Sequence, residues 1–195
     1  MSQIGAGVSY GDTYGTSGRI DGVPVDAVEV FPTVKTHEIE LGIGLFPFNA
    51  YYYGLSIGAG YTYNFNNTFG WEVLHFDQFF SIEKGLTSEL ADKYQVNPTS
   101  IETLRYDVSS DLSYVFANGK FAFDKDYIRY FRTALLLGPG LVSTDQRSEL
   151  AANFGLRFEF FSGDSLAWKF EARDSLPFGG IGNVLSFQLG TGIRF

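Results

Sequence analysis

The chain ends on Phe187-Gln188-Leu189-Gly190-Thr191-Gly192-Ile193-Arg194-Phe195, and this stretch decides the fold. Apolar or small side chains occupy the odd positions, whereas polar side chains or glycine occupy the even ones. Alternation with a period of two predicts a β-strand with two unlike faces. Because the chain ends with an aromatic residue on the apolar face, we interpret the stretch as the closing strand of a β-barrel that has lipid outside and polar packing inside.

The same alternation recurs about eight times along the chain. Before the closing strand it appears in residues 38–45, 55–65, 69–73, 104–114, 130–137, 153–160 and 166–173, and the third of these stretches is the least regular. The pattern predicts an all-β fold: an eight-stranded antiparallel up-and-down transmembrane β-barrel formed by residues 36–195. Residues 1–35 would precede it as an N-terminal periplasmic segment.

The predicted connections alternate in length, as those of such barrels do. Turn residues at 66–68, 117–120 and 162–165 predict short turns at the end where both barrel termini lie. The long connection, roughly residues 81–100, would then lie on the opposite, outer side. Within it, residues 87–94 could form a short helix, which Asn97-Pro98 would end.

Composition bounds the alternatives. The net charge is −8 and the sequence pI is near 4.7, which argues against a nucleic-acid-binding surface. No apolar run approaches the ~20 residues of a membrane-spanning helix. The chain has no cysteine, which excludes disulfides and thiolate metal sites. Met1 to Val25 lacks the features of a signal peptide, so for an exported protein we expect the numbering to begin after its removal or replacement.

Charged residues concentrate on the parity that would face the barrel interior. Acidic and basic residues nearly balance there, which predicts a paired, closed lumen. Asp77, Arg129 and Asp174 take the outward parity, each near a predicted strand end. The predicted lumen charge network consists of Glu38, Glu40, Glu72, Arg105, Asp107, Asp111, Arg132, Arg157, Glu159, Lys169, Glu171, Arg173 and Arg194.

A soluble all-β sandwich remains an alternative, because it would bury the apolar parity and solvate the polar one. The terminal phenylalanine, the charge balance and the aromatic residues near predicted turns favour the membrane barrel. The last strand also resembles the signature that outer-membrane assembly machinery reads. Its predicted assembly-signal residues are Phe187, Leu189, Ile193 and Phe195.

Five stretches resemble a known family, the outer-membrane β-barrel domain proteins of myxobacteria and Bdellovibrio-type bacteria. They are Leu86-Thr87-Ser88-Glu89-Leu90, Gly119-Lys120-Phe121, Leu137-Gly138-Pro139-Gly140-Leu141-Val142, Asn153-Phe154-Gly155-Leu156-Arg157-Phe158 and Trp168-Lys169-Phe170-Glu171-Ala172-Arg173-Asp174. The resemblance implies a small eight-stranded barrel in the outer membrane of a Gram-negative bacterium. It supplies no catalytic residues.

The residues also give little support to catalysis. Of the two histidines, His37 precedes the first barrel strand, and His75-Phe76-Asp77 lacks the His-X-Ser arrangement of outer-membrane lipid A deacylases. Inward carboxylates could act as acids or bases, but pairing with the basic residues on neighbouring strands is the simpler interpretation. Asp12, Asp21, Asp26 and Asp92 lack EF-hand spacing. We therefore expect no enzyme activity, no cofactor and no metal.

The sequence predicts a structural or anchoring role in the cell envelope. The alternative is a barrel subunit of a larger envelope-spanning assembly for motility, secretion or transport, docked through the N-terminal segment or the long outer loop. Val28, Val30 and Phe31 are the candidate docking residues in that segment. The expected partners are outer-membrane lipids, the assembly machinery during biogenesis and an envelope protein, with no nucleic acid.

Overall fold

The computed structural model describes residues 18–20, 23–25, 35–47, 52–83, 102–124, 127–163 and 165–195. The chain divides into two units, Met1–Pro32 and Thr33–Phe195. In the first unit, β1 (Gly18–Ile20) pairs antiparallel with β2 (Val23–Val25). None of the described residues forms a helix that is long and apolar enough to cross a membrane.

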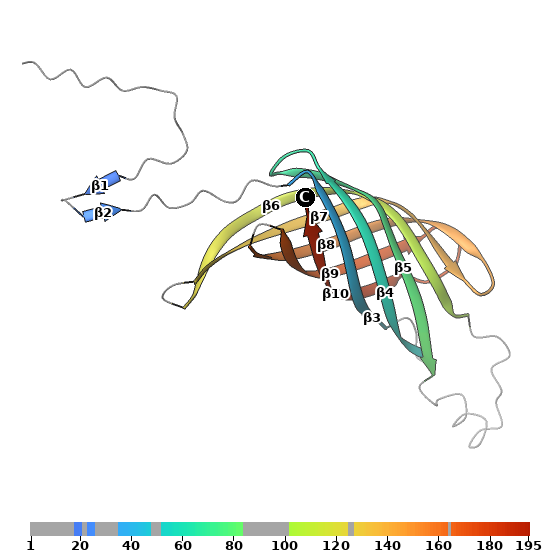
Figure 1. Ribbon diagram of the computed structural model, residues 1–195. Helices are drawn as coiled ribbons and strands as arrows, with labels where there is room; N and C mark the ends of the chain where they lie inside the picture. The colour runs from blue at the N-terminus through green and yellow to red at the C-terminus, as the bar shows by residue number, and fades with distance from the viewer. Residues whose placement is uncertain are drawn as a thin grey trace, which may run out of the picture. The chain divides into compact units, whose positions relative to one another are not determined.

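The second unit is a closed antiparallel barrel, as predicted (Figure 1). Each strand pairs with the next along the chain, and the last strand closes the barrel against the first from Phe187↔Leu45 to Arg194↔Glu38. The eight barrel strands are β3 (His37–Phe46), β4 (Tyr52–Asn64), β5 (Phe69–Glu83), β6 (Leu104–Asp124), β7 (Tyr127–Thr144), β8 (Ser148–Ser162), β9 (Leu166–Pro177) and β10 (Val184–Arg194).

The closing seam ends at the C-terminal residue. His37 donates its backbone N–H to the carbonyl of Phe195 at 3.1 Å, and Phe195 returns the bond at 3.0 Å. The two rings stack with centroids 5.6 Å apart. We call the end of the barrel that holds His37 and Phe195 the terminal end, and the opposite end, where β3 and β5 finish and β6 begins, the loop end.

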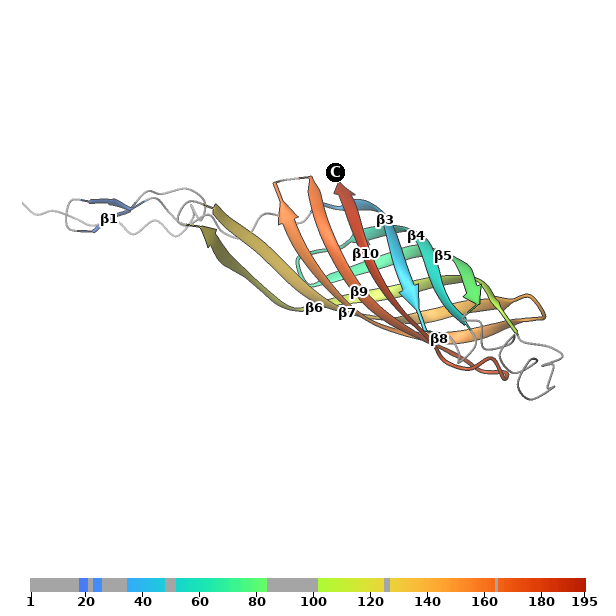
Figure 2. The same cartoon turned by 90° about the horizontal axis from the view of Figure 1, so that it is seen from below.

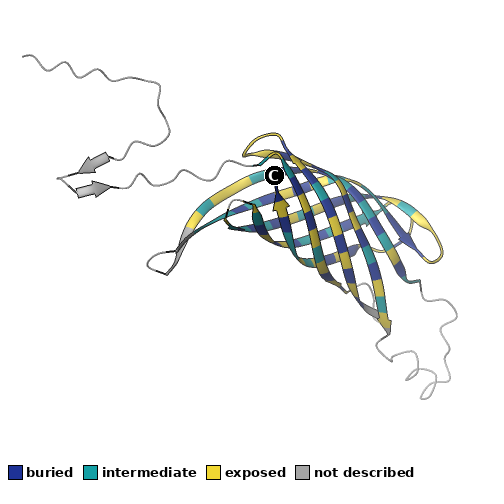
Figure 3. Ribbon diagram, in the orientation of Figure 1, coloured by how far each residue is buried: buried dark blue, intermediate teal, exposed yellow. Residues whose placement is uncertain are grey.

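Burial alternates along the strands, with inward side chains buried and outward ones exposed (Figure 3). The outer face is apolar: aliphatic side chains such as Leu41, Ile43 and Leu137 are more than half exposed. Exposed aromatic side chains gather near the terminal end. They are Tyr63, Phe65, Phe69, Trp71, Tyr114, Phe116, Trp168 and Phe195. This is the surface of a lipid-facing sheet with an aromatic girdle, because a water-soluble sheet would hide its apolar parity.

The strands are longer than the alternation predicted, and β5 and β6 depart most from it. β5 extends to Glu83, well past the predicted stretch of residues 69–73, because a bulge between Glu72 and His75 interrupts the alternation without ending the strand. The predicted helix at residues 87–94 lies outside the described residues.

The predicted turn at Ala117–Lys120 is wrong. These residues lie within β6 and pair with β7, for instance Gly119↔Phe131. A side chain at Gly119 would lie 2.9 Å from the Phe131 ring, which therefore covers the glycine across the strand pair. This cover stabilises an extended conformation that the Asn118-Gly119 turn signal disfavours. β6 and β7 consequently extend beyond the other strands (Figure 2).

Candidate functional site

Ion pairs fill the barrel lumen, and the first group lies nearest the terminal end. Arg132 of β7 donates from Nη2 to Glu159 at 3.1 Å and to Glu38 at 3.3 Å, and its Nε also donates to Glu159. Lys169 of β9 lies 2.7 Å from a Glu38 oxygen and also donates to Glu40. Lys169 also lies 3.6 Å from a Glu159 oxygen, so each of these basic groups bridges carboxylates of β3 and β8.

The second group occupies the middle of the lumen. Arg157 donates from Nε to Glu171 at 2.7 Å and from Nη2 to Glu72. Arg173 donates to the other Glu171 oxygen at 2.8 Å and to the other Glu72 oxygen at 2.7 Å. Both carboxylates thus accept from both guanidinium groups. Arg173 also pairs with Asp111, which continues the network toward β6.

His75 lies among carboxylates in the same region and is 2% exposed. Its Nδ1 lies 3.3 Å from Glu40 and 3.4 Å from Glu72, and its Nε2 lies 3.1 Å from Asp77. A neutral imidazole has only one N–H donor. Nδ1 and Nε2 can therefore both donate to carboxylates only when the ring carries two protons. The geometry therefore favours an imidazolium that helps to neutralise the carboxylates.

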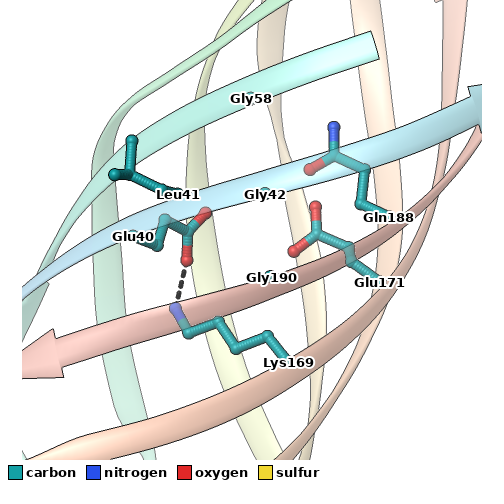
Figure 4. Close-up of a pocket in the computed structure, with 8 residues that line it drawn as sticks. All are labelled: Glu40, Leu41, Gly42, Gly58, Lys169, Glu171, Gln188 and Gly190. Carbon is teal, nitrogen blue, oxygen red and sulfur yellow. Dashed lines mark hydrogen bonds and ion pairs between the residues drawn. The ribbon is translucent and has the colours of Figure 1, made fainter. Parts of the chain in front are cut away.

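Glycines make room for these long side chains. A β-carbon at Gly60 would lie 2.5 Å from Oε1 of Glu40, and one at Gly192 would lie 2.3 Å from Oε1 of Glu38. Figure 4 shows Lys169 reaching Glu40 from β9 to β3, across the glycine-bearing strand β10 that lies between them. The glycines of this narrow barrel thus provide the space that its charge network occupies.

The loop end of the lumen is apolar instead. Its buried cluster joins inward side chains of six strands and one loop: Phe46, Phe79, Leu104, Val142, Ala151, Ile181 and Val184. Ile181 comes from the connection between β9 and β10, so part of that loop folds into the barrel mouth. The loop is held by one Glu149 carboxylate oxygen, which accepts the backbone N–H groups of Gly179, Gly180 and Ile181 at 2.8–3.1 Å.

In this arrangement, charged side chains neutralise one another and occupy the space inside the barrel. Oxygen or nitrogen atoms of Glu40, Glu72 and His75 lie within 4.8 Å of one another, close enough to hold a metal ion. However, Arg157 already donates to both of these carboxylates, so a guanidinium occupies the place of a cation. The side-chain partners of His75 are carboxylates, and none of the described residues brings a hydroxyl group into hydrogen-bond contact with its ring.

The structure buries nearly all of the predicted lumen residues inside the barrel. They are Glu38, Glu40, Glu72, Asp107, Asp111, Arg132, Arg157, Glu159, Lys169, Glu171, Arg173 and Arg194. Arg194 lies near the terminal end with its guanidinium 4.1 Å from the centre of the Phe161 ring, a cation–π contact. Asp107 accepts a hydrogen bond of 2.6 Å from Ser175.

Arg105 is the exception, and its prediction as a lumen residue is wrong. Its side chain is exposed, whereas Leu104, predicted to face outward, is buried in the apolar cluster. The cause is a register shift between Leu104 and Tyr106, which places Leu104 inward and Arg105 outward at the start of β6.

Asp77 was assigned to the outer face, and this is also wrong. It is 1% exposed, contacts His75 and accepts from Gln188 of β10. The bulge between Glu72 and His75 adds a residue and reverses the parity of β5 from His75 onward. Sequence reasoning therefore missed His75, Asp77 and the apolar cluster around Phe46 and Phe79 as parts of the interior. The other two residues assigned outward, Arg129 and Asp174, are partly exposed.

The predicted assembly-signal residues lie on the outer face of β10 or at the end of the chain. Phe187, Leu189, Ile193 and Phe195 are 42–58% exposed, as a lipid-facing row requires. Val28, Val30 and Phe31, the candidate docking residues, lie outside the described residues.

Neither a protein-family model nor a curated protein matches the chain. Among solved structures, the chain is similar to the N-terminal β-barrel domain of Pseudomonas aeruginosa OprF, with 12% identity and a TM-score of 0.56; the match covers 84% of this chain and 99% of that chain. It is also similar to the Yersinia pestis outer membrane protein Ail in a phospholipid bilayer nanodisc (18% identity, TM-score 0.47, 83% and 99% covered). A third match is Neisserial surface protein A (14% identity, TM-score 0.40, 82% and 96% covered). At these identities the OprF match concerns the fold: both chains form transmembrane β-barrels.

Proposed function

We propose that this protein is a plugged β-barrel that anchors in the outer membrane of a Gram-negative bacterium and has a structural, non-enzymatic role. The filled lumen carries the proposal. Paired charges occupy its terminal and middle parts, and an apolar cluster closes its loop end. An eight-stranded barrel has an interior only just wide enough for its side chains. From this filling we infer a closed lumen rather than an open channel or a substrate site.

The outer face and the last strand support the proposed location. Exposed aliphatic and aromatic side chains cover the barrel wall, which suits outer-membrane lipids as the surrounding solvent. The row that ends at Phe195 fits recognition by assembly machinery during biogenesis. The likeness to the OprF barrel supports the same location. The family of myxobacteria and Bdellovibrio-type bacteria remains our proposal for its relatives.

Membrane fractionation with two matched variants tests this proposal. Phe195→Ser should reduce the folded, heat-modifiable barrel in the outer membrane, because it removes the terminal aromatic residue. Phe65→Ser, at a turn of the same end, changes a residue of nearly equal exposure (55% against 58%) and should assemble normally. Equal assembly of the two variants would refute the assembly signal. Recovery of the wild-type chain as a folded monomer without detergent would refute the membrane location itself.

The second candidate function is a barrel subunit of a larger envelope-spanning assembly. The long β6–β7 hairpin favours it, because this hairpin extends beyond the barrel wall at the terminal end. Docking through Val28, Val30 and Phe31 or through the long outer loop remains part of this candidate. Co-purification of a stoichiometric partner from detergent-solubilised native membranes would favour the subunit over the independent anchor.

A further inference from the structure

The hairpin of β6 and β7 outgrows its neighbours at the terminal end. The last β6 residue that pairs with β5 is Tyr114, and the first β7 residue that pairs with β8 is Phe131. Past these residues, within the described part of the chain, the two strands pair only with each other, as far as Asp124↔Tyr127. We call residues 115–124 and 127–130 the β6–β7 ribbon. Both views show it leaving the barrel wall (Figures 1 and 2).

The ribbon has left the lipid-facing band. Near the terminal end of the barrel wall, the outward side chains of β6 are apolar and exposed at Leu112, Tyr114 and Phe116, and Phe116 is the last described residue of that row. Beyond it, Ala117, Asn118 and Lys120 are all exposed, so polar and small side chains are exposed on both faces of β6 in this part of the ribbon. A barrel strand that continued in lipid would keep its apolar parity. The ribbon therefore extends into water at the terminal end, which is periplasmic in the proposed orientation.

The outer edge of β6 in the ribbon is long and unprotected. Val115 still donates its backbone N–H to the carbonyl of Thr68 at 2.7 Å, but from Phe116 to Asp124 the main-chain groups that point away from β7 find no strand partner among the described residues. At about 3.3 Å per residue, this edge is about 30 Å long. Proteins usually protect such edges with proline, with short strands or with covering segments. The ribbon sequence contains no proline, and β6, with 21 residues, is the longest strand of the barrel.

An open strand edge selects its partner by main-chain geometry. Only an extended polypeptide presents N–H and C=O groups at the spacing of a strand, which is the basis of β-strand addition. The ribbon contains two basic residues, Lys120 and Arg129, and one acidic residue, Asp124, whereas the chain as a whole has a net charge of −8. This local positive balance suits a neutral or acidic strand and disfavours the like-charged ribbon of a second copy.

We propose that the outer edge of β6 from Phe116 to Asp124 docks an extended, neutral or acidic segment of another envelope protein by β-strand addition. The proposal rests on the outer-membrane placement proposed above, which orients the ribbon toward the periplasm. The added strand would turn the two-stranded ribbon into a three-stranded sheet and link the anchored barrel to a periplasmic partner.

Amide hydrogen exchange tests the docked strand directly. The probe is the wild-type chain, compared in native outer-membrane vesicles and, after purification, in phospholipid nanodiscs. We expect exchange in residues 116–124 to be at least tenfold slower in the native vesicles, because the added strand protects the edge amides. Equal exchange in the two preparations would refute the proposal. Protection in nanodiscs with a dimeric mass would assign the edge to a second copy and also overturn it.

A photo-crosslinking amino acid identifies the occupant. At Asn118 on the ribbon we expect one discrete adduct with a different envelope protein, whereas at Thr68, exposed at a neighbouring turn, we expect none. The adduct at Asn118 should disappear when Asn-Gly replaces residues 120–130 between Gly119 and Phe131, a change that keeps Arg132 and the barrel wall. Equal adducts at Asn118 and Thr68, or an adduct that survives the shortening, would contradict edge docking.

The same vesicles separate this proposal from the one on which it rests. Sedimentation of the wild-type barrel with the outer membrane tests the location, and exchange at the ribbon tests the docking. A barrel in the outer membrane whose ribbon exchanges freely would refute the docking alone.

Discussion

Arg157 is enclosed in the barrel and donates to the carboxylates of Glu171, Glu72 and Glu40. A single basic residue thereby links strands β3, β5, β8 and β9 through side chains alone. Isolated buried charges are costly, whereas paired and hydrogen-bonded ones are tolerated. The residues of this network should therefore behave as a unit when one of them is changed.

The Arg157–Glu171 pair should show strong energetic coupling. Glu171→Gln removes the carboxylate charge that the buried Arg157 and Arg173 share, so we expect a loss of about 3–5 kcal/mol in the free energy of unfolding. Adding Arg157→Met should cost less than the sum of the single changes, with a coupling energy of about 1–3 kcal/mol. Urea unfolding in lipid vesicles measures all three variants. Glu102–Arg147, an exposed pair at the loop end, serves as the control and should couple more weakly.

Glycine at position 60 should be required for packing. Gly60→Ala would place a methyl group within 2.5–2.8 Å of three Glu40 atoms, and Glu40 is held by its ion pairs. We expect this variant to lose about 1–3 kcal/mol of unfolding free energy in the same assay. Gly182→Ala is the matched control, because nothing lies within 4 Å of its β-carbon position. Equal stability of the two variants would show that the lumen has spare room.

Sequence parity alone places most of the network. Glu38, Arg157 and Arg194 lie on regular strands, so alternation is enough to assign them to the interior. Alternation does not predict which charged residues pair with one another. Arg132 on β7 reaches Glu38 on β3, and such a contact depends on how the barrel closes. The sequence around His75 does not distinguish a lumen residue from an interface residue, because one of its carboxylate partners, Glu40, comes from another strand.

At the scale of elements, the β5 bulge is the feature that alternation could not reveal. A bulge is recognised from the pairing of a strand with its neighbour. Here the pair Thr62↔Glu72 is followed by Tyr61↔Leu74, which skips one residue of β5. Val73 is the extra residue. It lets Glu72 and His75 both face the lumen, which assigns Asp77 to the interior as well.

Two single-residue deletions test this account of β5. Deleting Val73 removes the extra residue and leaves Glu72, His75 and Asp77 facing inward, so the barrel should still fold and remain heat-modifiable. Deleting Phe76 would turn Asp77 toward lipid and Phe79 out of the apolar cluster, so we expect assembly to fail. Outer-membrane yield and gel mobility after folding measure both. Failure of both deletions alike, or success of both, would contradict the assigned register.

The hairpin of β6 and β7 shows a second limit of local signals. Asn118-Gly119 is turn chemistry, yet it lies inside a strand pair because Phe131 covers the glycine from β7. A residue far along the chain thus decides the local conformation. The turn residues near Asn66–Thr68 and Gly163 do mark real turns. At both places the paired strands end, at Asn64↔Gly70 and Ser162↔Leu166, so the local signal and the barrel agree.

At the scale of the whole molecule, the closing strand and the number of strands can be predicted from the sequence. The alternation recurs in each strand, and the last strand ends with an aromatic residue on its apolar face. The division of the lumen cannot be predicted in this way. Charges fill the middle, whereas Phe46, Phe79 and Ile181 close the loop end, and Ile181 reaches it from a loop. In the proposed function, the two parts together close the path through the barrel.

Planar-bilayer recording tests that claim most directly. Folded wild-type protein, verified by heat modifiability, should insert without producing a stable conductance, because paired charges and an apolar cluster block the lumen in series. Stable, large conductance from the same folded protein would reveal an open pore and contradict the plugged barrel.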